Sequence, residues 1–267
     1  MKYGMLVLDI DGTLTNSKKE ITKKTKDALI NLQERGVRVV LASGRPTPGI
    51  RAVAEELSLA HFSNFILSFN GAKIINCGSG EAIYQKTVPV NLIPQIYQAA
   101  LQNNAGLISY EGDSVIAATD IDEYMALEAR VNRMPIHKVE NFDKYVTFPV
   151  NKCLMTAAPK YAEELEKILR KQFYGQLDIY RSEPYFVELM PNGVDKAQSV
   201  NRLAGSLGLN REQIVCCGDG FNDISMIEYA GLGVAMENAQ EKVRERADYV
   251  TASNDADGIV QVIETFF

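Results

Sequence analysis

The sequence predicts an α/β protein with a doubly wound, Rossmann-like parallel-sheet core whose chain is interrupted by an inserted α+β domain. Two observations support this prediction. At both ends of the chain, nearly continuous apolar stretches alternate with amphipathic stretches over short links, which is typical of parallel strands joined by crossover helices. The middle of the chain instead mixes turn signals, β-branched runs and separate helical patterns, which is typical of hairpins packed against helices.

The N-terminal part alternates strand, helix, strand, helix, strand. Residues 5–8 read MLVL, and a helical pattern follows whose apolar face is formed by Ile21, Ala28, Leu29 and Leu32. Gly36 is well placed to end this helix, because glycine readily adopts the left-handed backbone found just past helix ends. The next expected elements are a strand at 37–43, a helix after Pro46 and Pro48, and a strand at 64–69.

The inserted domain is predicted at residues 84–188, which leaves residues 1–83 and 189–267 for the core. Before the insert, Asn70-Gly71 and the GSG at 78–80 are hairpin signals between β-branched runs. Within it we expect helices at 92–102, 123–130 and 160–172. The expected strands lie at 106–112, 113–120, 152–158, 177–182 and 185–191.

The α/β alternation resumes at Asp195, which is a plausible N-cap for a helix over residues 195–208. A strand at 214–220 follows, with a continuous apolar run that is typical of a strand buried on both faces. The remaining elements are a helix at 223–229, a strand at 233–236, a helix at 240–246, a strand at 248–251 and a final helix.

Composition and charge narrow the classes of function. The chain has 267 residues, 46% of them hydrophobic, and a formal net charge of −6, which disfavours nonspecific nucleic-acid and anionic-membrane binding. No apolar run approaches the ~20 residues that span a bilayer. We see no basic stretch followed by a long apolar one at the N-terminus, so the sequence predicts no signal peptide and a cytoplasmic protein.

The four cysteines match no zinc-binding spacing. They are Cys77, Cys153, Cys216 and Cys217. The adjacent Cys216 and Cys217 lie on an expected buried strand, where neighbouring side chains point to opposite faces. We therefore predict reduced thiols in the protein core, as is usual in the cytoplasm.

Polar residues follow three of the apolar strands where each strand ends. Asp9 and Asp11 follow the first strand, Ser43, Gly44 and Arg45 follow the second, and the run from Asp219 to Asp223 follows the strand after the insert. In open α/β sheets, ligands bind outside the carboxyl ends of the strands. We therefore expect these residues to converge on one edge of the sheet.

If these segments converge, they form a pocket rich in carboxylates, which repel one another unless a cation lies among them. Hard oxygen ligands with some water suit Mg²⁺. The two histidines, His61 and His137, fall away from these segments, which weakens a zinc interpretation. Lys196 lies where the chain re-enters the core, and from there it could reach the acidic edge and neutralise phosphate charge.

Four segments in this order resemble the motifs of the haloacid-dehalogenase-like (HAD) phosphatases: DIDGTLTNS, SGR, Lys196 and GDGFND. The long insert is similar to the type IIB cap of the Cof-type subfamily. The segments FNGA and ELMPNGVDKA resemble sequence motifs of the same subfamily. The resemblance covers the whole chain. It implies a phosphatase that hydrolyses phosphate monoesters of small metabolites, with sugar phosphates favoured.

The resemblance implies a role for each matching residue. Asp9 would be the nucleophile that forms an aspartyl-phosphate. Asp11, which dehalogenases and P-type ATPases lack, would protonate the leaving alcohol and then activate water. Mg²⁺ would be held by Asp9, the backbone carbonyl of Asp11, Asp219 and, through water, Asp223. The phosphoryl group would be held by Ser43, Gly44, Lys196, Asn222 and the backbone amide of Ile10.

The cap would set substrate choice by contacting the leaving group. Three further residues could contact the substrate, and each also has a purely structural interpretation. Arg45 could instead be a surface charge, Asn70 a turn residue and Glu188 a salt-bridge partner. Thr13 is expected to tether the catalytic loop by a hydrogen bond. A phosphomannomutase-like phosphotransferase and a noncatalytic sensor of phosphorylated metabolites stay open as alternatives. The sequence predicts neither the particular metabolite nor the oligomeric state.

Overall fold

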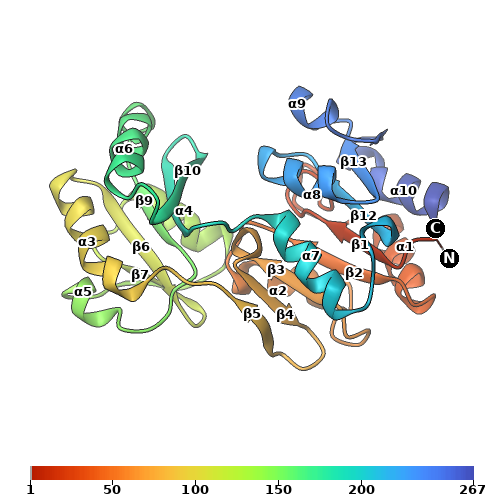
Figure 1. Ribbon diagram of the computed structural model, residues 1–267, viewed down its shortest axis with the longest axis horizontal. Helices are drawn as coiled ribbons and strands as arrows, with labels where there is room; N and C mark the ends of the chain where they lie inside the picture. The colour runs from red at the N-terminus through yellow and green to blue at the C-terminus, as the bar shows by residue number, and fades with distance from the viewer. Residues whose placement is uncertain (1) are drawn as a thin grey trace. The chain divides into compact units, whose positions relative to one another are not determined.

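The computed structural model describes residues 2–267, which form two compact units. The first contains the chain up to Tyr84 together with Asp195–Phe267, and the second contains Gln85–Val194. Figure 1 traces the chain leaving the first unit after β5 and returning to it at α7. The boundary expected at 188/189 falls inside β11 (Phe186–Pro191), which pairs with two strands of the second unit and therefore stays there as a whole.

The described part of the first unit contains one eight-stranded sheet in the order β14-β13-β12-β1-β2-β3-β4-β5. The strands from β14 to β3 pair in parallel, and β4 joins antiparallel to β3. Their bounds are β1 Met5–Leu8, β2 Arg38–Ala42, β3 Phe65–Ser68, β4 Lys73–Asn76, β5 Ala82–Gln85, β12 Ile214–Gly218, β13 Leu232–Met236 and β14 Tyr249–Thr251.

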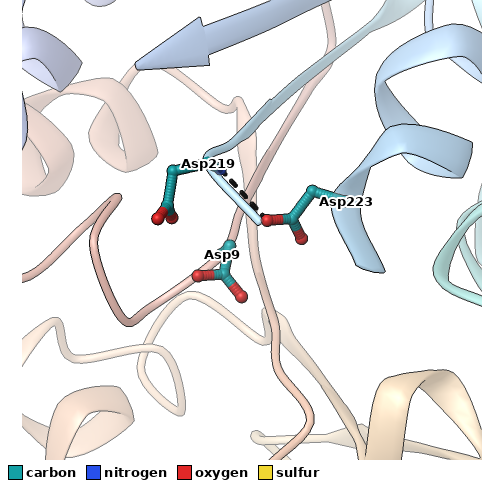
Figure 2. Close-up of side chains that lie close together, drawn as sticks. All are labelled: Asp9, Asp219 and Asp223. Carbon is teal, nitrogen blue, oxygen red and sulfur yellow. Dashed lines mark hydrogen bonds between the residues drawn. The ribbon is translucent and has the colours of Figure 1, made fainter. Parts of the chain in front are cut away.

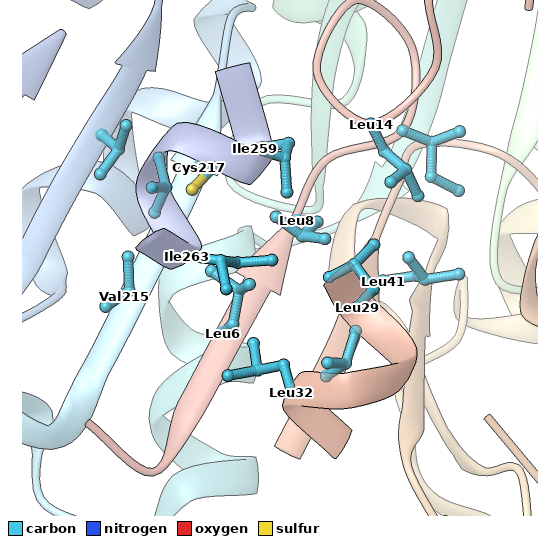
Figure 3. Packing of buried hydrophobic residues seen from close by; sticks show 14 of the residues in the cluster. Leu6, Leu8, Leu14, Leu29, Leu32, Leu41, Val215, Cys217, Ile259 and Ile263 are labelled. Atoms are coloured by element: carbon cyan, nitrogen blue, oxygen red, sulfur yellow. The ribbon is translucent and has the colours of Figure 1, made fainter. Parts of the chain in front are cut away.

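Helices cover both faces of this sheet, which confirms the doubly wound core. One buried cluster combines residues of the sheet with α1 (Lys23–Glu34), α2 (Thr47–Glu56), α9 (Glu241–Arg244) and α10 (Gly258–Phe266), and Figure 3 shows its packing. A second cluster contains residues of α7 (Lys196–Ser206) and α8 (Ile224–Tyr229). Cys217 belongs to the first cluster and Cys216 to the second, so their side chains point to opposite faces as predicted.

Local sequence explains where the helices around the site begin and end. The side chain of Thr22 accepts a hydrogen bond from the amide of Thr25 and caps α1, which ends just before Gly36 at φ +86°. Asp195 caps α7 in the same way, accepting from the amide of Gln198. This cap was predicted, and it starts α7 at Lys196.

The second unit is an α+β domain with one six-stranded sheet among the described residues, in the order β10-β11-β9-β6-β7-β8. All its strand pairs are antiparallel except β7 with β8. The strands are β6 Gly106–Glu111, β7 Ser114–Ala117, β8 Ile136–Lys138, β9 Cys153–Thr156, β10 Leu177–Glu183 and β11 Phe186–Pro191. The helices are α3 Ile93–Gln102, α4 Glu123–Val131, α5 Phe142–Tyr145 and α6 Pro159–Gln172.

Two elements of the second unit were not predicted, β8 and α5. Each has only three or four residues, too few to show a hydrophobic period. Helices α3, α5 and α6 contribute to one buried cluster with the sheet. Within residues 2–267, no helix is both long enough and apolar enough to cross a lipid bilayer.

Candidate active site

Three carboxylates meet at the carboxyl ends of β1 and β12. Asp9 follows β1, Asp219 follows β12, and Asp223 ends the short helical turn before α8. One carboxylate oxygen from each of these three side chains lies within 4.8 Å of the other two, and Figure 2 shows the side chains converging. Since β1 and β12 are adjacent parallel strands, their ends necessarily share one edge of the sheet.

Lys196 is fully buried and lies against two of these carboxylates. Its Nζ donates to Asp9 Oδ1 at 2.7 Å and to Asp223 Oδ1 at 2.6 Å. The other oxygen of Asp223 accepts the backbone amides of Asp219 and Gly220, at 3.1 and 2.9 Å. Asp223 therefore holds both the lysine and the loop after β12.

The electrostatics of this cluster show an excess of negative charge. Burial, with Asp223 and Asp219 nearby, raises the pKa of Asp9 to about 8, although Lys196 opposes the shift. Burial also raises the pKa of Asp219 to about 6. The pKa of Lys196 would fall through burial, but Asp223 and Asp9 raise it above the usual lysine range, so the lysine stays protonated.

The donor set fits a hard divalent cation. Asp9 and Asp219 supply carboxylate oxygens, and their raised pKa values indicate a site where a further positive charge is favourable. Asp223 has hydrogen-bond partners on both oxygens, which suits a contact to a metal through water better than a direct one. The residues present therefore fit Mg²⁺.

Asp11 is held by two cations of its own unit. Arg45 donates from Nε to Oδ2 and from Nη2 to Oδ1, both at 2.7 Å, and Lys19 Nζ donates to Oδ1 at 2.9 Å. Burial alone would raise the pKa of Asp11, but the bonds to Arg45 and Lys19 lower it below its usual value. Arg45, considered above as a substrate contact or a surface charge, is thus an ion-pair partner of Asp11.

The loop that runs from Asp11 to the start of α1 is bonded to the end of β12. Thr13 donates from Oγ1 to Asp219 Oδ1 at 2.7 Å, so the tether predicted for Thr13 is present. Gly12 has a φ of +88°, and a Cβ at this position would overlap the Asp219 carboxylate. Glycine at position 12 therefore lets the loop approach Asp219.

The other candidate phosphate ligands lie beside Asn70. The amide of Asn70 donates to the carbonyl of the buried Ser43 at 2.9 Å, and Asn222 Nδ2 donates to Asn70 Oδ1 at 3.1 Å. A Cβ on Gly44 would lie 3.1 Å from that same Oδ1. Asn70 adopts a left-handed backbone, with φ 54° and ψ 27°, in the turn between β3 and β4. The side chain of Ile10 is buried in the core.

Glu188 lies on β11 in the second unit and is not part of this cluster. Its Oε1 accepts from Lys152 Nζ at 3.1 Å, and both side chains are buried. Its Oε2 is buried without a hydrogen-bond partner in the part of the chain that the structure describes. Of the two interpretations considered for Glu188, the ion pair is observed.

Several side chains that pair with predicted residues or loops escaped the sequence analysis. Lys19 pairs with Asp11, and Lys152 pairs with Glu188, without any motif around either lysine. Asn238 and Asn254 donate to backbone carbonyls of the loop that follows Asp11. Asparagines in C-terminal loops carry no pattern of their own. Only the folded chain places them near residues more than 200 positions earlier.

A family model described as haloacid dehalogenase-like hydrolase matches residues 6–263. The chain belongs to this family. A solved haloacid dehalogenase-like hydrolase from Bacteroides thetaiotaomicron is 45% identical over 100% of both chains, with a TM-score of 0.95. The HAD subclass IIB sugar phosphatase BT4131 is 26% identical over 98% of both chains, with a TM-score of 0.83.

A relative with a stated substrate is the 5-amino-6-(5-phospho-D-ribitylamino)uracil phosphatase YcsE of Bacillus subtilis (strain 168). It is 28% identical over 265 residues, which are 97% of this hydrolase and 94% of YcsE. These likenesses confirm the predicted Cof-type HAD phosphatase with a type IIB cap. The α/β fold class is confirmed by the same solved structures.

Proposed function

We propose that this HAD phosphatase hydrolyses phosphate monoesters of small metabolites through an aspartyl-phosphate on Asp9 and depends on Mg²⁺. The observation that carries the proposal is the contact of the buried Lys196 with Asp9 inside a cluster of three carboxylates. A protonated lysine beside the proposed nucleophile offsets the repulsion between its carboxylate and a phosphate dianion. It also stabilises the charge that the transferring phosphoryl group carries.

In the first step, an oxygen of the Asp9 carboxylate attacks phosphorus in line with the ester bond. The new bond joins phosphorus to Asp9, and the bond from phosphorus to the ester oxygen breaks. Asp11 gives a proton to the departing oxygen, so the leaving group departs as an alcohol. To carry that proton, Asp11 must separate from Arg45 and Lys19 in the substrate complex, because their bonds lower its pKa in the free enzyme. The side chain of Asp11 is then a carboxylate, the form that the bonds from Arg45 and Lys19 favour.

In the second step, the carboxylate of Asp11 takes a proton from water while the water oxygen attacks phosphorus. The bond between phosphorus and Asp9 breaks, which restores the Asp9 carboxylate, releases inorganic phosphate and leaves Asp11 protonated for the next cycle. Lys196 holds Asp9 Oδ1 throughout, because its raised pKa keeps it protonated across the neutral range.

Asp9, Asp219, the backbone carbonyl of Asp11 and, through water, Asp223 are the residues we assign to Mg²⁺. When bound, the ion supplies positive charge for the phosphoryl oxygens and a template for in-line geometry. For the phosphoryl group itself we assign Ser43 Oγ, Lys196 Nζ, Asn222 Nδ2 and the backbone amides of Ile10 and Gly44. Asn70 orients the Asn222 amide by accepting its hydrogen bond.

We propose sugar phosphates as the substrate class. The support is the likeness to BT4131, described as a sugar phosphatase, and to YcsE, whose named substrate carries its phosphate on a ribityl chain. A sugar phosphate and a phosphorylated ribityl group both present a phosphate on a polyhydroxylated carbon chain. We assign the choice among such substrates to the proposed cap at residues 84–188.

We also propose a cytoplasmic enzyme that acts on free metabolites. All four cysteines are free thiols among residues 2–267, and three of them are buried, as suits a reducing compartment. The net charge of −6 disfavours a nucleic-acid substrate.

A phosphate-release screen tests the proposed function. The panel holds glucose 6-phosphate, ribose 5-phosphate, mannose 6-phosphate, flavin mononucleotide and pyridoxal phosphate, each with Mg²⁺ and with EDTA. We expect inorganic phosphate from at least one sugar phosphate with Mg²⁺ and loss of this activity with EDTA. Isomerised sugar phosphate without phosphate release would indicate the phosphomannomutase-like alternative. Binding without turnover would indicate a sensor.

A further inference from the structure

The loop that carries Asp11 receives hydrogen bonds from a distant part of the chain. Asn238 Nδ2 donates to the carbonyl of Gly12 at 2.8 Å, and Asn254 Nδ2 donates to the carbonyl of Thr15 at 2.8 Å. These asparagines lie 226 and 239 positions further along the sequence than the residues they contact. Gly12 directly follows Asp11, so a bond at its carbonyl constrains the backbone that bears the carboxyl group.

The two asparagines also contact each other. The backbone amide of Asn254 donates to Asn238 Oδ1 at 3.0 Å. Asn238 therefore uses its oxygen toward Asn254 and its amide group toward the loop, which sets the orientation of its side chain. Asn238 follows β13 and Asn254 follows β14, so the bonds link the loop after β1 to the ends of two other strands of the sheet.

Inside the loop, the backbone bonds close a tight turn. The amide and Oγ1 of Thr15 both donate to the carbonyl of Ile10 at 2.9 Å, and Asp11 forms an isolated bridge with Thr15. These bonds join the two ends of the turn but do not connect it to the rest of the sheet. Asn238 and Asn254 make that connection at Gly12 and Thr15, on either side of Thr13, which is itself bonded to Asp219.

We propose that Asn238 and Asn254 act together as positioning residues that place the Asp11 carboxyl group for proton transfer to the leaving group. The inference rests on the proposed function, because it presupposes that Asp11 is the general acid. Arg45 and Lys19 hold the Asp11 side chain at its carboxylate, and the two asparagines hold the backbone from which that side chain extends. A misplacement of about 1 Å can cost about 10²-fold in rate.

Two aryl phosphates of similar shape separate positioning from a structural role. Phenyl phosphate releases phenol, whose pKa near 10 makes protonation of the leaving oxygen important, as for a tyrosine side chain. 4-Nitrophenyl phosphate releases a much less basic group, which departs with little help from an acid. The quantity to compare is kcat/KM, because it covers the steps up to release of the first product and excludes hydrolysis of the phosphoenzyme.

The variants are Asn238→Ala, Asn254→Ala and the near-isosteric Asn254→Asp, which keeps the side-chain size but removes the N–H donor. The matched control is Asn103→Ala in the second unit, which removes the same kind of bond, Nδ2 to the carbonyl of Ala99 at 2.8 Å. Circular dichroism and thermal unfolding check that each variant is folded.

We expect the three loop variants to lower kcat/KM for phenyl phosphate about 10- to 100-fold, within the usual range of general-acid contributions. For 4-nitrophenyl phosphate we expect a decrease of about 3-fold or less, because that step needs little proton transfer. The Asn103→Ala variant should match the wild type with both esters.

Equal losses with the two esters in folded variants would overturn the positioning role, and so would values equal to those of Asn103→Ala. If Asn254→Asp stayed as active as the wild type, the donated bond to Thr15 would be irrelevant. A wild-type enzyme inactive on both esters and on the whole sugar-phosphate panel would instead overturn the proposed function, and the positioning role with it.

Discussion

At the scale of single residues, the buried ion cluster around Lys196 decides what the site can do. Its ammonium group contacts Asp9 and Asp223, and all three side chains are buried. A buried charge is tolerated only when its partners compensate for the lost solvation, so each member depends on the others. The same environment raises the pKa of Asp9 and keeps Lys196 protonated.

The first prediction concerns Asp9. The Asp9→Asn variant keeps the shape of the side chain and its hydrogen bonding, but an amide oxygen does not form the acyl phosphate. We expect phosphate release to fall at least about 10⁴-fold, as for other covalent nucleophiles. The fold should persist, because the neutral amide resembles the protonated form that the raised pKa favours. Near-normal turnover would refute the assignment of Asp9.

The second prediction concerns Lys196. The Lys196→Met variant leaves two buried carboxylates without their cation, which should cost about 3–5 kcal/mol in the free energy of unfolding in the absence of metal. Urea unfolding measures the loss. The exposed Lys167, which pairs with Glu163 on α6, provides the control, since Lys167→Met should leave stability unchanged. Equal stability of the two variants would contradict the role of Lys196 in the cluster.

At the scale of elements, the sequence predicted most helices and strands because their signals are local. Apolar runs mark the core strands, Asp195 and Gly36 mark helix ends, and Asn70-Gly71 marks a turn. The elements it missed, β8 and α5, are too short to show a period. The second boundary fell inside β11, because membership of a sheet depends on hydrogen-bonded partners that a single strand does not reveal.

The third prediction belongs to helix α7, whose N-terminus presents Lys196 to the site. Asp195→Ala removes the cap that accepts from the amide of Gln198, so we expect a loss of about 0.5–2 kcal/mol in stability. Chemical unfolding measures this loss. Asp195→Asn, which keeps an accepting oxygen, should retain most of the stability. If alanine and asparagine were equally destabilising, capping would not explain the effect.

At the scale of the whole molecule, two units with separate buried clusters share one chain. The first unit has a cluster on each face of its sheet, and the second has its own cluster around α3, α5 and α6. The functional groups of the first unit come from both sides of the insertion: Asp9 and Asp11 precede it, and Lys196 and Asp219 follow it. The active-site cluster therefore forms only when the N- and C-terminal parts assemble into one sheet.

The fourth prediction links pH, metal and global stability. In the unfolded chain both Asp9 and Asp219 have pKa values near 3.9, whereas in the metal-free folded state these values are about 8 and about 6. The folded state thus binds more protons, so the contribution of these groups to stability is highest below pH 4. It is lost progressively as pH rises to about 8.

Mg²⁺ binds the deprotonated carboxylates, so it should stabilise the protein more at high pH than at low pH. We expect the increase in Tm on adding Mg²⁺, relative to EDTA, to be larger at pH 8 than at pH 5.5. Thermal unfolding across this range measures it, with Asp9→Asn as a variant whose increment should depend less on pH. A Tm increment independent of pH would contradict the shifted carboxylates.

The sequence by itself determined the fold class and which residues lie at the edge of the sheet. Apolar strands followed by polar residues place Asp9, Ser43 and Asp219 at the same strand ends wherever the strands are parallel. Only the tertiary structure decided the partners of these residues. The bonds from Lys196 to Asp223, from Arg45 to Asp11 and from Asn238 to Gly12 depend on loops distant in sequence. Side-chain pairing follows from three-dimensional packing of those loops, whereas strand formation follows from a local apolar pattern.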